Sequence, residues 1–257
     1  MPSAGEPFDP SAFDPAAYGR RAAQGYDTFH AALDPSAAVE TLAELAAGQP
    51  AVEFGIGTGR IALPLAARGL EVHGIDGSPE MVSELRRKPG GDQIRVIVGN
   101  FAEALAGTRF GLVILALNTV YALPTQDAQV ACFRNAARHL VTGGSFVVEA
   151  WVPDVGAFRN GTAVRPVQIE DGHVELEIAR IQPAAQTMQT TKVHLSAQGS
   201  RLIPANHRYA WPSELDLMAR LAGLRLAHRW EDWQRAPFRD TSTAHISVWE
   251  KVPGGAW

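Results

Sequence analysis

The sequence predicts an α/β fold in which helices cover both faces of a doubly wound, mainly parallel sheet. Two observations carry this prediction. Over residues 1–150, short apolar runs alternate with helical patterns, which is typical of βαβ units. The first apolar run also leads into a glycine-rich turn at residues 53–60, where glycines let a strand turn sharply into a helix. We therefore expect ligands to bind at the carboxyl ends of the strands.

Each element of the first 151 residues has its own signal. The segment before Pro15 is rich in proline and alanine, and we expect its tip to be poorly ordered. Asp34 or Ser36 can cap a first long helix. The next patterns predict a helix at 61–68, a strand at 70–76 and a helix that begins at Ser78-Pro79. Strands at 94–98 and 112–117 follow, then a helix at 126–140, an exit turn at Gly143-Gly144 and a strand at 145–151. The run at 112–117 is almost wholly apolar, as expected of a central parallel strand.

Residues 152–211 break the alternation and predict an antiparallel insertion. Period-two alternation at 173–181 continues as strand-like runs at 187–195 and 201–211, separated by turn residues at Asp171-Gly172, Pro183 and Gly199. Inserted after the fifth strand, this unit would lie over the site as a lid on the substrate side; a sheet that only forms an interface is the alternative. A helix at 213–222 and strands at 224–230 and 244–252 complete the fold.

The expected domain organisation follows from this order of elements. Residues 1–151 form an N-terminal segment and a ligand-binding core with a Rossmann-like sheet, residues 152–211 form the antiparallel lid, and residues 212–257 complete the core. The first part carries the binding chemistry and the second closes over it.

The composition is that of a globular protein of ordinary charge. The 257 residues are 46% hydrophobic and 19% charged, so the chain can bury a substantial core. A formal net charge of −4 offers no electrostatic footprint for nucleic acid. No apolar run reaches the roughly 18 residues of a membrane helix, and residues 1–7 lack a charged-then-apolar secretion signal. We expect a soluble cytoplasmic protein that binds neither nucleic acid nor membranes, as a monomer or homodimer.

Cysteine and histidine usage argues against metal chemistry. The single cysteine, Cys132, excludes an internal disulfide and a three-cysteine iron-sulfur site, and its predicted helix makes it a buried, inert thiol. His73, His139, His194 and Asp154 show no ligand spacing such as H-x-x-x-H. We therefore expect no metal site.

The glycine-rich turn narrows the class of ligand that the chain is expected to bind. Its sequence is G-x-G-x-G with Glu53 two residues before Gly55, and Asp76 ends the next strand, 21 residues after Gly55. A carboxylate at Asp76 can accept hydrogen bonds from both hydroxyls of a ribose. Position 60 is Arg where a dinucleotide fingerprint has its third glycine, and Glu53 would repel a pyrophosphate but attract a cationic ligand. A nicotinamide cofactor is thereby disfavoured.

This motif resembles the first motif of class I S-adenosyl-L-methionine (SAM) dependent methyltransferases. The wider chain is similar to small-molecule methyltransferases of secondary metabolism, especially enzymes that N,N-dimethylate aminosugars, at residues 26–30, 143–151 and 193–195. The resemblance implies SAM as cofactor and S-adenosyl-L-homocysteine (SAH) as product. Only this resemblance implies that the N-terminal segment, whose ordered part is expected at residues 14–33, acts as a cap over the ligand. The cofactor residues that it implies are Glu53, Gly55, Gly57, Gly59, Asp76, Gly77, Met81, Asn100, Phe101, Leu117 and Asn118. Asn100 departs from the family's usual aspartate, but its amide oxygen can still accept from an exocyclic amine.

The chemistry expected of such an enzyme is alignment more than acid–base catalysis. A sulfonium-borne methyl is already a good electrophile, so rate comes from in-line positioning and exclusion of water. The expected reaction is methyl transfer to a nitrogen or an electron-rich, indole-like aromatic carbon of a small natural product. Three alternatives remain: an O-methyltransferase with a histidine base, an NAD(P)-dependent oxidoreductase, and a SAM binder without catalytic activity.

Candidate catalytic and substrate residues cluster at the same predicted strand ends and in the lid. The catalytic candidates are Tyr26, His30, Tyr121, Glu149 and His207, and the substrate candidates are Tyr18, Tyr121, Trp151, Tyr209 and Trp211. Tyr121 should point into the cleft, and Glu149 needs a partner because it ends an apolar strand. His207 can instead be an exposed strand histidine, and the aromatic residues can instead be core. The region of Asp216, Asp232 and Trp233 is interpreted as solvated surface.

Overall fold

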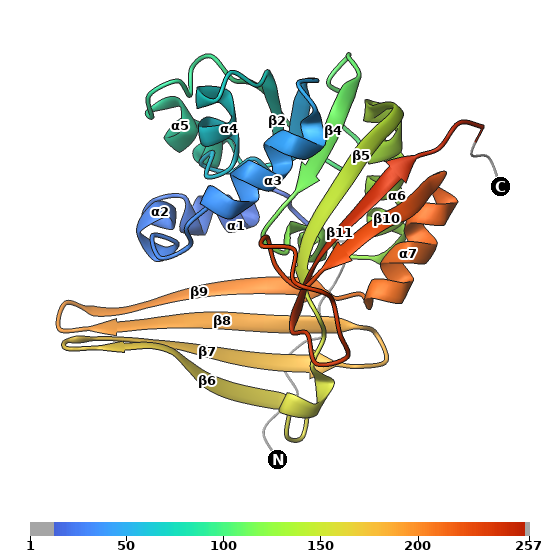
Figure 1. Cartoon of the computed structure of the whole chain (residues 1–257). Coiled ribbons are helices and arrows are strands. Elements are labelled where there is room, and N and C mark those ends of the chain that lie inside the picture. The colour runs from blue at the N-terminus through green and yellow to red at the C-terminus, as the bar shows by residue number, and fades with distance from the viewer. Residues whose placement is uncertain (1–12, 255–257) are drawn as a thin grey trace.

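The computed structural model describes residues 13–254 and contains two separate sheets (Figure 1). The expectation of a poorly ordered tip before Pro15 falls mainly on residues outside this described part. The helices are α1 (Ala17–Ala22), α2 (Tyr26–Phe29), α3 (Ser36–Ala46), α4 (Ala62–Ala67), α5 (Pro79–Arg86), α6 (Gln126–His139) and α7 (Pro212–Leu221), with short 3-10 turns η2 (Thr119–Ala122) and η3 (Val155–Ala157). The strands are β1 (Ala51–Phe54), β2 (Val72–Asp76), β3 (Arg95–Val98), β4 (Phe110–Leu115), β5 (Leu140–Trp151), β6 (Thr162–Glu170), β7 (His173–Gln182), β8 (Thr187–Ser196), β9 (Gly199–Arg208), β10 (Leu224–Trp230) and β11 (Ala244–Lys251).

The larger sheet confirms the predicted doubly wound fold. Its seven strands have the order β10-β11-β5-β4-β1-β2-β3; β1 to β5 are parallel, and β11 runs antiparallel to both of its neighbours, β5 and β10. Helices α3, α4 and α5 pack on one face, and α6 and α7 pack on the other. Strands β1 and β4 are buried throughout, as their apolar runs predict for strands covered on both faces. The order reverses between β1 and β4, where ligands of such sheets bind.

The start of β5 differs from the prediction. The sequence predicts a helix to Leu140 and a turn at Gly143-Gly144, but the structure ends α6 at His139 and begins β5 at Leu140. The pairing of β5 with β4 shifts between Phe110 and Leu112, so residues 141–144 form an irregular start to the strand. Gly143, with φ of 79°, supplies the left-handed backbone that this irregularity needs. The glycine pair therefore lies within the strand and does not separate it from the helix.

The insertion is a four-stranded antiparallel sheet with the order β6-β7-β8-β9. The predicted strands at 173–181, 187–195 and 201–211 correspond to β7, β8 and β9, while β6 carries no clear alternation and was not predicted. Strand β9 contacts α1 and η2, and Figure 1 shows the sheet extended beneath the edge where β4 and β5 end. Helices α1 and α2 lie between this sheet and the core (Figure 1).

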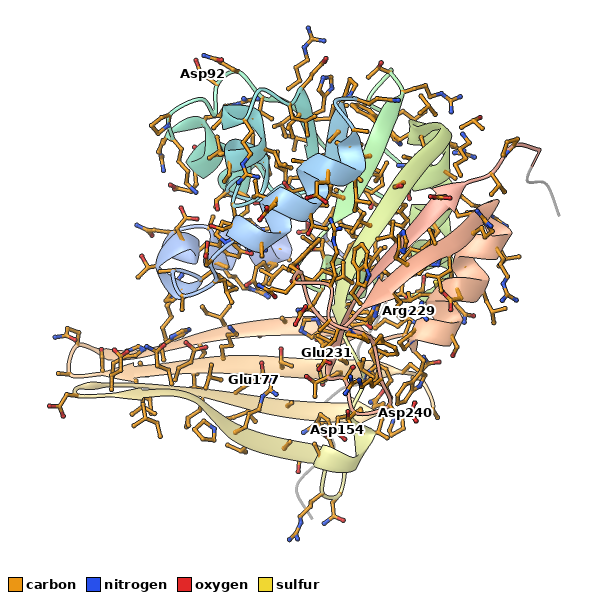
Figure 2. The ribbon with its side chains drawn as sticks, viewed as in Figure 1. Asp92, Asp154, Glu177, Arg229, Glu231 and Asp240 are labelled. Carbon is orange, nitrogen blue, oxygen red and sulfur yellow. The ribbon has the colours of Figure 1, made fainter. Side chains whose placement is uncertain are left out.

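Figure 2 shows how the two sheets meet: Arg229, Glu231, Asp154 and Asp240 lie near their junction, and Asp92 lies at the opposite edge of the core.

Cys132 is buried in the described structure, as expected, and burial raises the pKa of its thiol. No helix within residues 13–254 is long and apolar enough to cross a membrane.

Candidate functional site

The glycine loop connects β1 to α4 at the point where the strand order of the larger sheet reverses. Gly55 and Gly57 have φ values of 69° and 55°, which residues with a Cβ rarely adopt. A Cβ on Gly55 would lie 2.6 Å from Thr119 Cγ2 in the turn after β4. A Cβ on Gly57, in contrast, would meet only the Gly55 carbonyl oxygen, at 3.9 Å. The loop thus packs tightly at one side and leaves backbone accessible at Gly57.

Asp76 joins the ends of β1 and β2. Its carboxylate accepts hydrogen bonds from the Gly57 amide (2.7 Å) and from the Ser78 amide (2.8 Å). Burial raises its pKa, against the lowering by these two hydrogen bonds. Because each carboxylate oxygen offers a second lone pair, Asp76 can still accept from the two hydroxyls of a ribose. The adjacent Gly77 lies against the cap segment, since a Cβ there would be 2.6 Å from Pro15.

Glu53 carries an unsatisfied buried oxygen. The residue is 4% exposed, and its Oε2 has no hydrogen-bond partner among the residues that the structure describes. Burial raises the pKa of this carboxyl to about 8, although the Arg60 guanidinium lowers it. An isolated buried carboxylate is costly, and a cationic ligand would compensate it. Glu53 could therefore pair with a cationic group of a ligand, and Arg60, whose role the sequence did not reveal, supplies the opposite charge beside it.

Glu149 has the partner that the sequence predicted it would need. Its two oxygens accept from the Leu117 amide (2.8 Å) and from the indole Nε1–H of Trp233 (2.9 Å), and the Arg60 guanidinium lies 4.0 Å away. The interpretation of Trp233 as solvated surface is wrong, because the ring packs on the core. Asp216 accepts hydrogen bonds from the Arg229 guanidinium and from the indole N–H of Trp249.

The turn after β4 is held by its neighbours. Leu117 and Asn118 have φ values of 50° and 63°, an uncommon conformation for residues other than glycine. The Asn118 Oδ1 accepts from the Trp151 amide at 2.7 Å, and the Asn118 amide donates to the Glu149 carbonyl at 2.9 Å. Strand β5 thus holds this turn in its strained form beside the glycine loop, as at many binding sites.

The cap segment supplies an aromatic stack. The Tyr26 ring stacks on His30 with centroids 4.2 Å apart, and Tyr18 meets Tyr26 edge-on at 6.4 Å. Burial raises the pKa of Tyr26 and of Tyr18 and lowers the pKa of His30. The structure thus brings Tyr18, Tyr26 and His30 together, as the sequence predicts. Tyr26 lies close enough to Glu53, Arg60 and Asp76 for their charges to affect its pKa.

A second contact of the cap was not predicted. Asp27 accepts a hydrogen bond from the Thr58 hydroxyl inside the glycine loop (2.6 Å) and forms an ion pair with Lys88 (2.6 Å). Lys88 also donates to the Thr58 carbonyl at 2.7 Å. These three residues tie α2 to the glycine loop. They are far apart in the chain, so no local pattern could have revealed them.

The prediction that Tyr121 points into the cleft is wrong. Its ring is fully buried, and its hydroxyl lies 2.9 Å from the carbonyls of both Trp151 and Ala210, to which it donates. Trp151 contacts Tyr121 at 4.6 Å and Tyr209 at 6.1 Å between ring centroids. These three aromatic residues form a cluster where β5 leads into the antiparallel sheet, and Tyr209 is itself buried.

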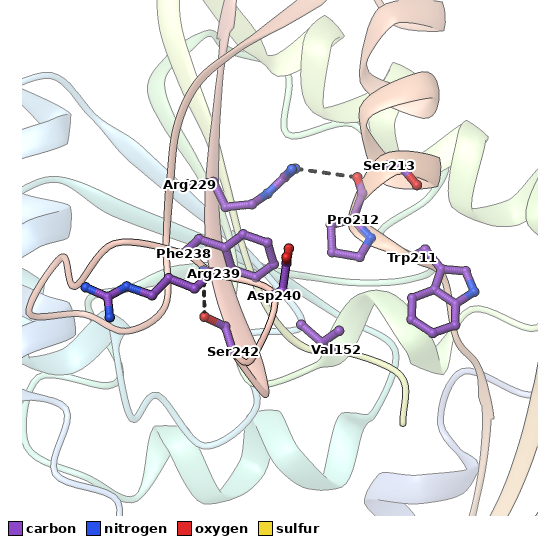
Figure 3. A pocket seen from close by; sticks show the side chains of 9 residues that line it. All are labelled: Val152, Trp211, Pro212, Ser213, Arg229, Phe238, Arg239, Asp240 and Ser242. Carbon is purple, nitrogen blue, oxygen red and sulfur yellow. Dashed lines mark hydrogen bonds between the residues drawn. The ribbon is translucent and has the colours of Figure 1, made fainter. Parts of the chain in front are cut away.

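His207 and Trp211 lie outside the aromatic cluster of Tyr121, Trp151 and Tyr209. His207 is not the exposed strand histidine that the sequence allows: its Nε2 lies 3.2 Å from the Thr190 hydroxyl, and burial lowers its pKa to about 4. Trp211 is 37% exposed and lies at the edge of a hollow of about 350 Å³, which Figure 3 shows between the start of α7 and the loop after β10. Arg229 and Phe238 line the same hollow.

The remaining cofactor candidates lie after β2 and β3. Met81 is buried in α5, whose first turn is capped by the Ser78 hydroxyl. Asn100 directs its Oδ1 to the Ala102 amide at 3.0 Å, and the buried Phe101 ring stacks on Phe54. The amide oxygen that the sequence predicts as an acceptor for an exocyclic amine therefore already accepts from the Ala102 backbone. The structure therefore groups the predicted residues at one edge of the sheet.

A nucleotide-bearing, cationic ligand fits this edge, and the comparisons with known proteins agree. A family model for a methyltransferase domain matches residues 51–144. The solved CcbJ methyltransferase from Streptomyces caelestis is 39% identical, with a TM-score of 0.88, over 94% of this chain and 100% of that chain. The chain belongs to the class I SAM-dependent methyltransferases.

Two further relatives extend the comparison. The cypemycin N-terminal methyltransferase from Streptomyces sp is 26% identical over 245 residues, 93% of this chain and 99% of that protein. SAM-bound CalS10, an amino pentose methyltransferase from Micromonospora echinaspora, shares the fold at 21% identity with a TM-score of 0.66, over 88% of this chain and 97% of that chain.

Proposed function

We propose that this protein methylates a neutral amine nitrogen of a small natural product. The observation that carries the proposal is the state of the candidate bases, each of which is weakened or already engaged. One relative is named an N-terminal methyltransferase and another an amino pentose methyltransferase, and both names support the same choice. A neutral amine attacks with its own lone pair, whereas an alcohol or phenol benefits from a base.

The cofactor would be held by residues at the ends of β1, β2 and β4. Glu53 would compensate the amino group, Arg60 the carboxylate, and Asp76 the ribose hydroxyls, while Asn100 and Phe101 would face the adenine. SAM, when bound, supplies a methyl group on a sulfonium and so a ready electrophile. The contribution of this chain is to orient the acceptor and exclude water beneath the cap and the antiparallel sheet.

The candidate bases support a mechanism without proton abstraction. Glu149 accepts from Leu117 and Trp233, and the Tyr121 hydroxyl donates to backbone carbonyls. The lowered pKa of His207, about 4, makes its imidazole a weak base. Burial keeps Tyr26 protonated and lowers the pKa of His30. An acceptor that needs no base suits these surroundings.

The antiparallel sheet would act as the substrate lid. We assign residues 1–151 to the cap and cofactor core, residues 152–211 to the lid, and residues 212–257 to the completion of the core. The contacts of β9 with α1 and η2 support this division, since they put the sheet against both the cap and the turn after β4.

The decisive experiment is methyl transfer from labelled SAM to matched panels of small amines, indoles and phenols. We expect methylated product from an amine, with kcat/KM rising with pH as the free-base fraction of that amine rises. The Asp76→Asn variant is the control, because transfer that depends on the proposed site should fall when Asp76 is replaced. Preferential labelling of a phenol, with a pH profile set by an enzyme group, would support the O-methyltransferase alternative, and labelling of an indole carbon would move the acceptor class to carbon.

A further inference from the structure

The antiparallel sheet carries a cluster of metal-ligating side chains that the proposed reaction does not use. His173 and Glu175 lie two residues apart on β7 and therefore on the same face of the sheet. Glu175 pairs directly with His194 of β8, which puts His194 on that face as well. One ligand atom from each of the three residues lies within 4.8 Å of the other two.

We propose that His173, Glu175 and His194 bind a divalent transition metal ion of the zinc class. Two imidazoles and one carboxylate are a common ligand set for zinc, with water in the fourth position. Zn–N and Zn–O bonds of about 2.0 Å at tetrahedral angles separate neighbouring ligand atoms by roughly 3.3 Å. The His194 Nδ1 and the Glu175 Oε2 are 3.4 Å apart, so this pair already has the required spacing.

The state of His194 is a second, independent observation. Its ring is 7% exposed, yet neither ring nitrogen has a hydrogen-bond partner within the described residues 13–254. Buried polar groups without partners are costly and rare. The Phe29 ring stacks on His194 with centroids 4.5 Å apart and so covers a face of the ring, while Nδ1 lies 3.4 Å from Glu175 Oε2 without hydrogen-bonding geometry. A metal ion bound at Nδ1 or Nε2 would satisfy one of them.

The charged neighbours define how the ion would be accommodated. Lys192 lies 3.4 Å from Glu175 Oε1, so it holds one carboxylate oxygen and leaves Oε2 on the side of His194. Arg201, whose guanidinium lies over Phe29 and donates to the Arg21 carbonyl, is a second positive charge nearby. Both charges would weaken cation binding without blocking it. Imidazole ligands favour zinc, cobalt or nickel over magnesium or calcium.

The position of the cluster predicts its effect. The cluster faces α2, because Phe29 of that helix covers His194, and Figure 1 shows α2 above this end of the antiparallel sheet. An ion here would join β7 to β8 beneath the cap. Since the ion binds the folded protein, saturation would raise the thermal unfolding midpoint.

The test uses the full chain stripped with a chelator and then titrated with Co²⁺ or Zn²⁺ alone. We expect one equivalent of Co²⁺ to give the intense visible absorption of a tetrahedral site, and Zn²⁺ to displace it. Loss of an outer-shell partner already costs about 10- to 100-fold in metal affinity, so His194→Ala and Glu175→Gln should weaken binding by at least about 100-fold. Cooperative thermal unfolding of the metal-free variants checks that they are folded.

Two further variants make the result decisive. His228→Ala removes an exposed histidine of β10 and should leave the affinity unchanged. Lys192→Met removes the competing charge and should tighten Zn²⁺ binding by about tenfold. Absence of stoichiometric binding, or full binding by His194→Ala, would overturn the proposal, as would loss of binding in His228→Ala equal to that in His194→Ala.

Discussion

Glu53 is the residue at which binding and stability oppose each other. Its buried carboxyl has a pKa of about 8 in the folded protein, above the usual value of 4.5, because burial disfavours the charge. The folded state therefore holds a proton that the unfolded state has released between these two pH values. The contribution of Glu53 to stability consequently falls as pH rises from about 4.5 to 8. A cationic ligand reverses this by stabilising the carboxylate.

Replacing Glu53 with Gln should stabilise the ligand-free protein in alkaline buffer. The expected difference in thermal midpoint between Glu53→Gln and the wild type is close to zero at pH 5 and grows through pH 8, since only the wild type must ionise a buried group. Differential scanning calorimetry across this range measures it. SAH affinity should fall in the same variant. A midpoint difference independent of pH would refute the raised pKa.

Asp76 should determine cofactor affinity. Asp76→Asn removes the charge that would hold the ribose hydroxyls, and hydrogen bonds to a charged group contribute about 1.5–3 kcal/mol, which corresponds to roughly 10- to 100-fold in SAH affinity. Isothermal titration calorimetry measures the change. Asp92→Asn, an exposed aspartate remote from this edge, is the matched control. Equal affinities in Asp76→Asn and Asp92→Asn would remove Asp76 from the site.

Residues within one local motif could be predicted from the sequence, and residues from distant segments could not. The glycine loop and Asp76 follow each other through one βαβ unit, so their proximity is fixed by the local fold. Trp233 and Glu149 are 84 positions apart, and Asp27 and Thr58 are 31 positions apart. Only tertiary packing brings such pairs together, so neither pair has a sequence signature.

At the scale of elements, the contact between α2 and the glycine loop connects the cap to the proposed cofactor site. Helix α2 is a single turn, too short to be stable alone. The hydrogen bond from Thr58 to Asp27 and the ion pair of Asp27 with Lys88 hold it in place. The stability of the cap therefore depends on these side chains more than on helix propensity.

Thr58→Val should loosen the cap. Valine keeps the shape of this buried side chain but removes a hydrogen bond to a carboxylate, worth about 1.5–3 kcal/mol. We expect faster amide hydrogen exchange over residues 17–33 and SAH dissociation about tenfold faster or more. Thr28→Val, at an exposed position of the same helix, should match the wild type. Unchanged exchange and dissociation in Thr58→Val would show that this contact does not hold the cap.

Strands were predictable where burial imposes a pattern. Strand β4 is buried on both faces and reads as a continuous apolar run, whereas β6 is exposed along almost its whole length and its sequence has no constraint to display. Likewise, the absence of H-x-x-x-H spacing argues only against a metal site whose ligands lie on one helix. Glu175 and His194 are opposed by strand pairing, a relation that spacing along the chain does not reveal.

At the scale of the whole molecule, three parts of the chain converge on one edge of the larger sheet. The parallel strands deliver the glycine loop and Asp76, the cap reaches the loop through Asp27, and the antiparallel sheet contacts both the cap and the turn after β4. A ligand at this edge would contact segments far apart in the chain. Its binding energy should therefore appear as stability of the entire fold.

This coupling distinguishes the cofactor classes without any knowledge of the acceptor. SAH at about 100 times its dissociation constant stabilises the folded state by roughly 2.7 kcal/mol, which for a chain of this size raises the thermal midpoint by about 5–10 °C. NAD(P)H at equal concentration should leave it unchanged, because Glu53 opposes a pyrophosphate and Arg60 replaces the third fingerprint glycine. Thermal unfolding with each ligand measures both shifts. A shift with NAD(P)H and none with SAH would contradict the cofactor assignment, whereas equal stabilisation of wild type and Asp76→Asn by SAH would contradict only the site.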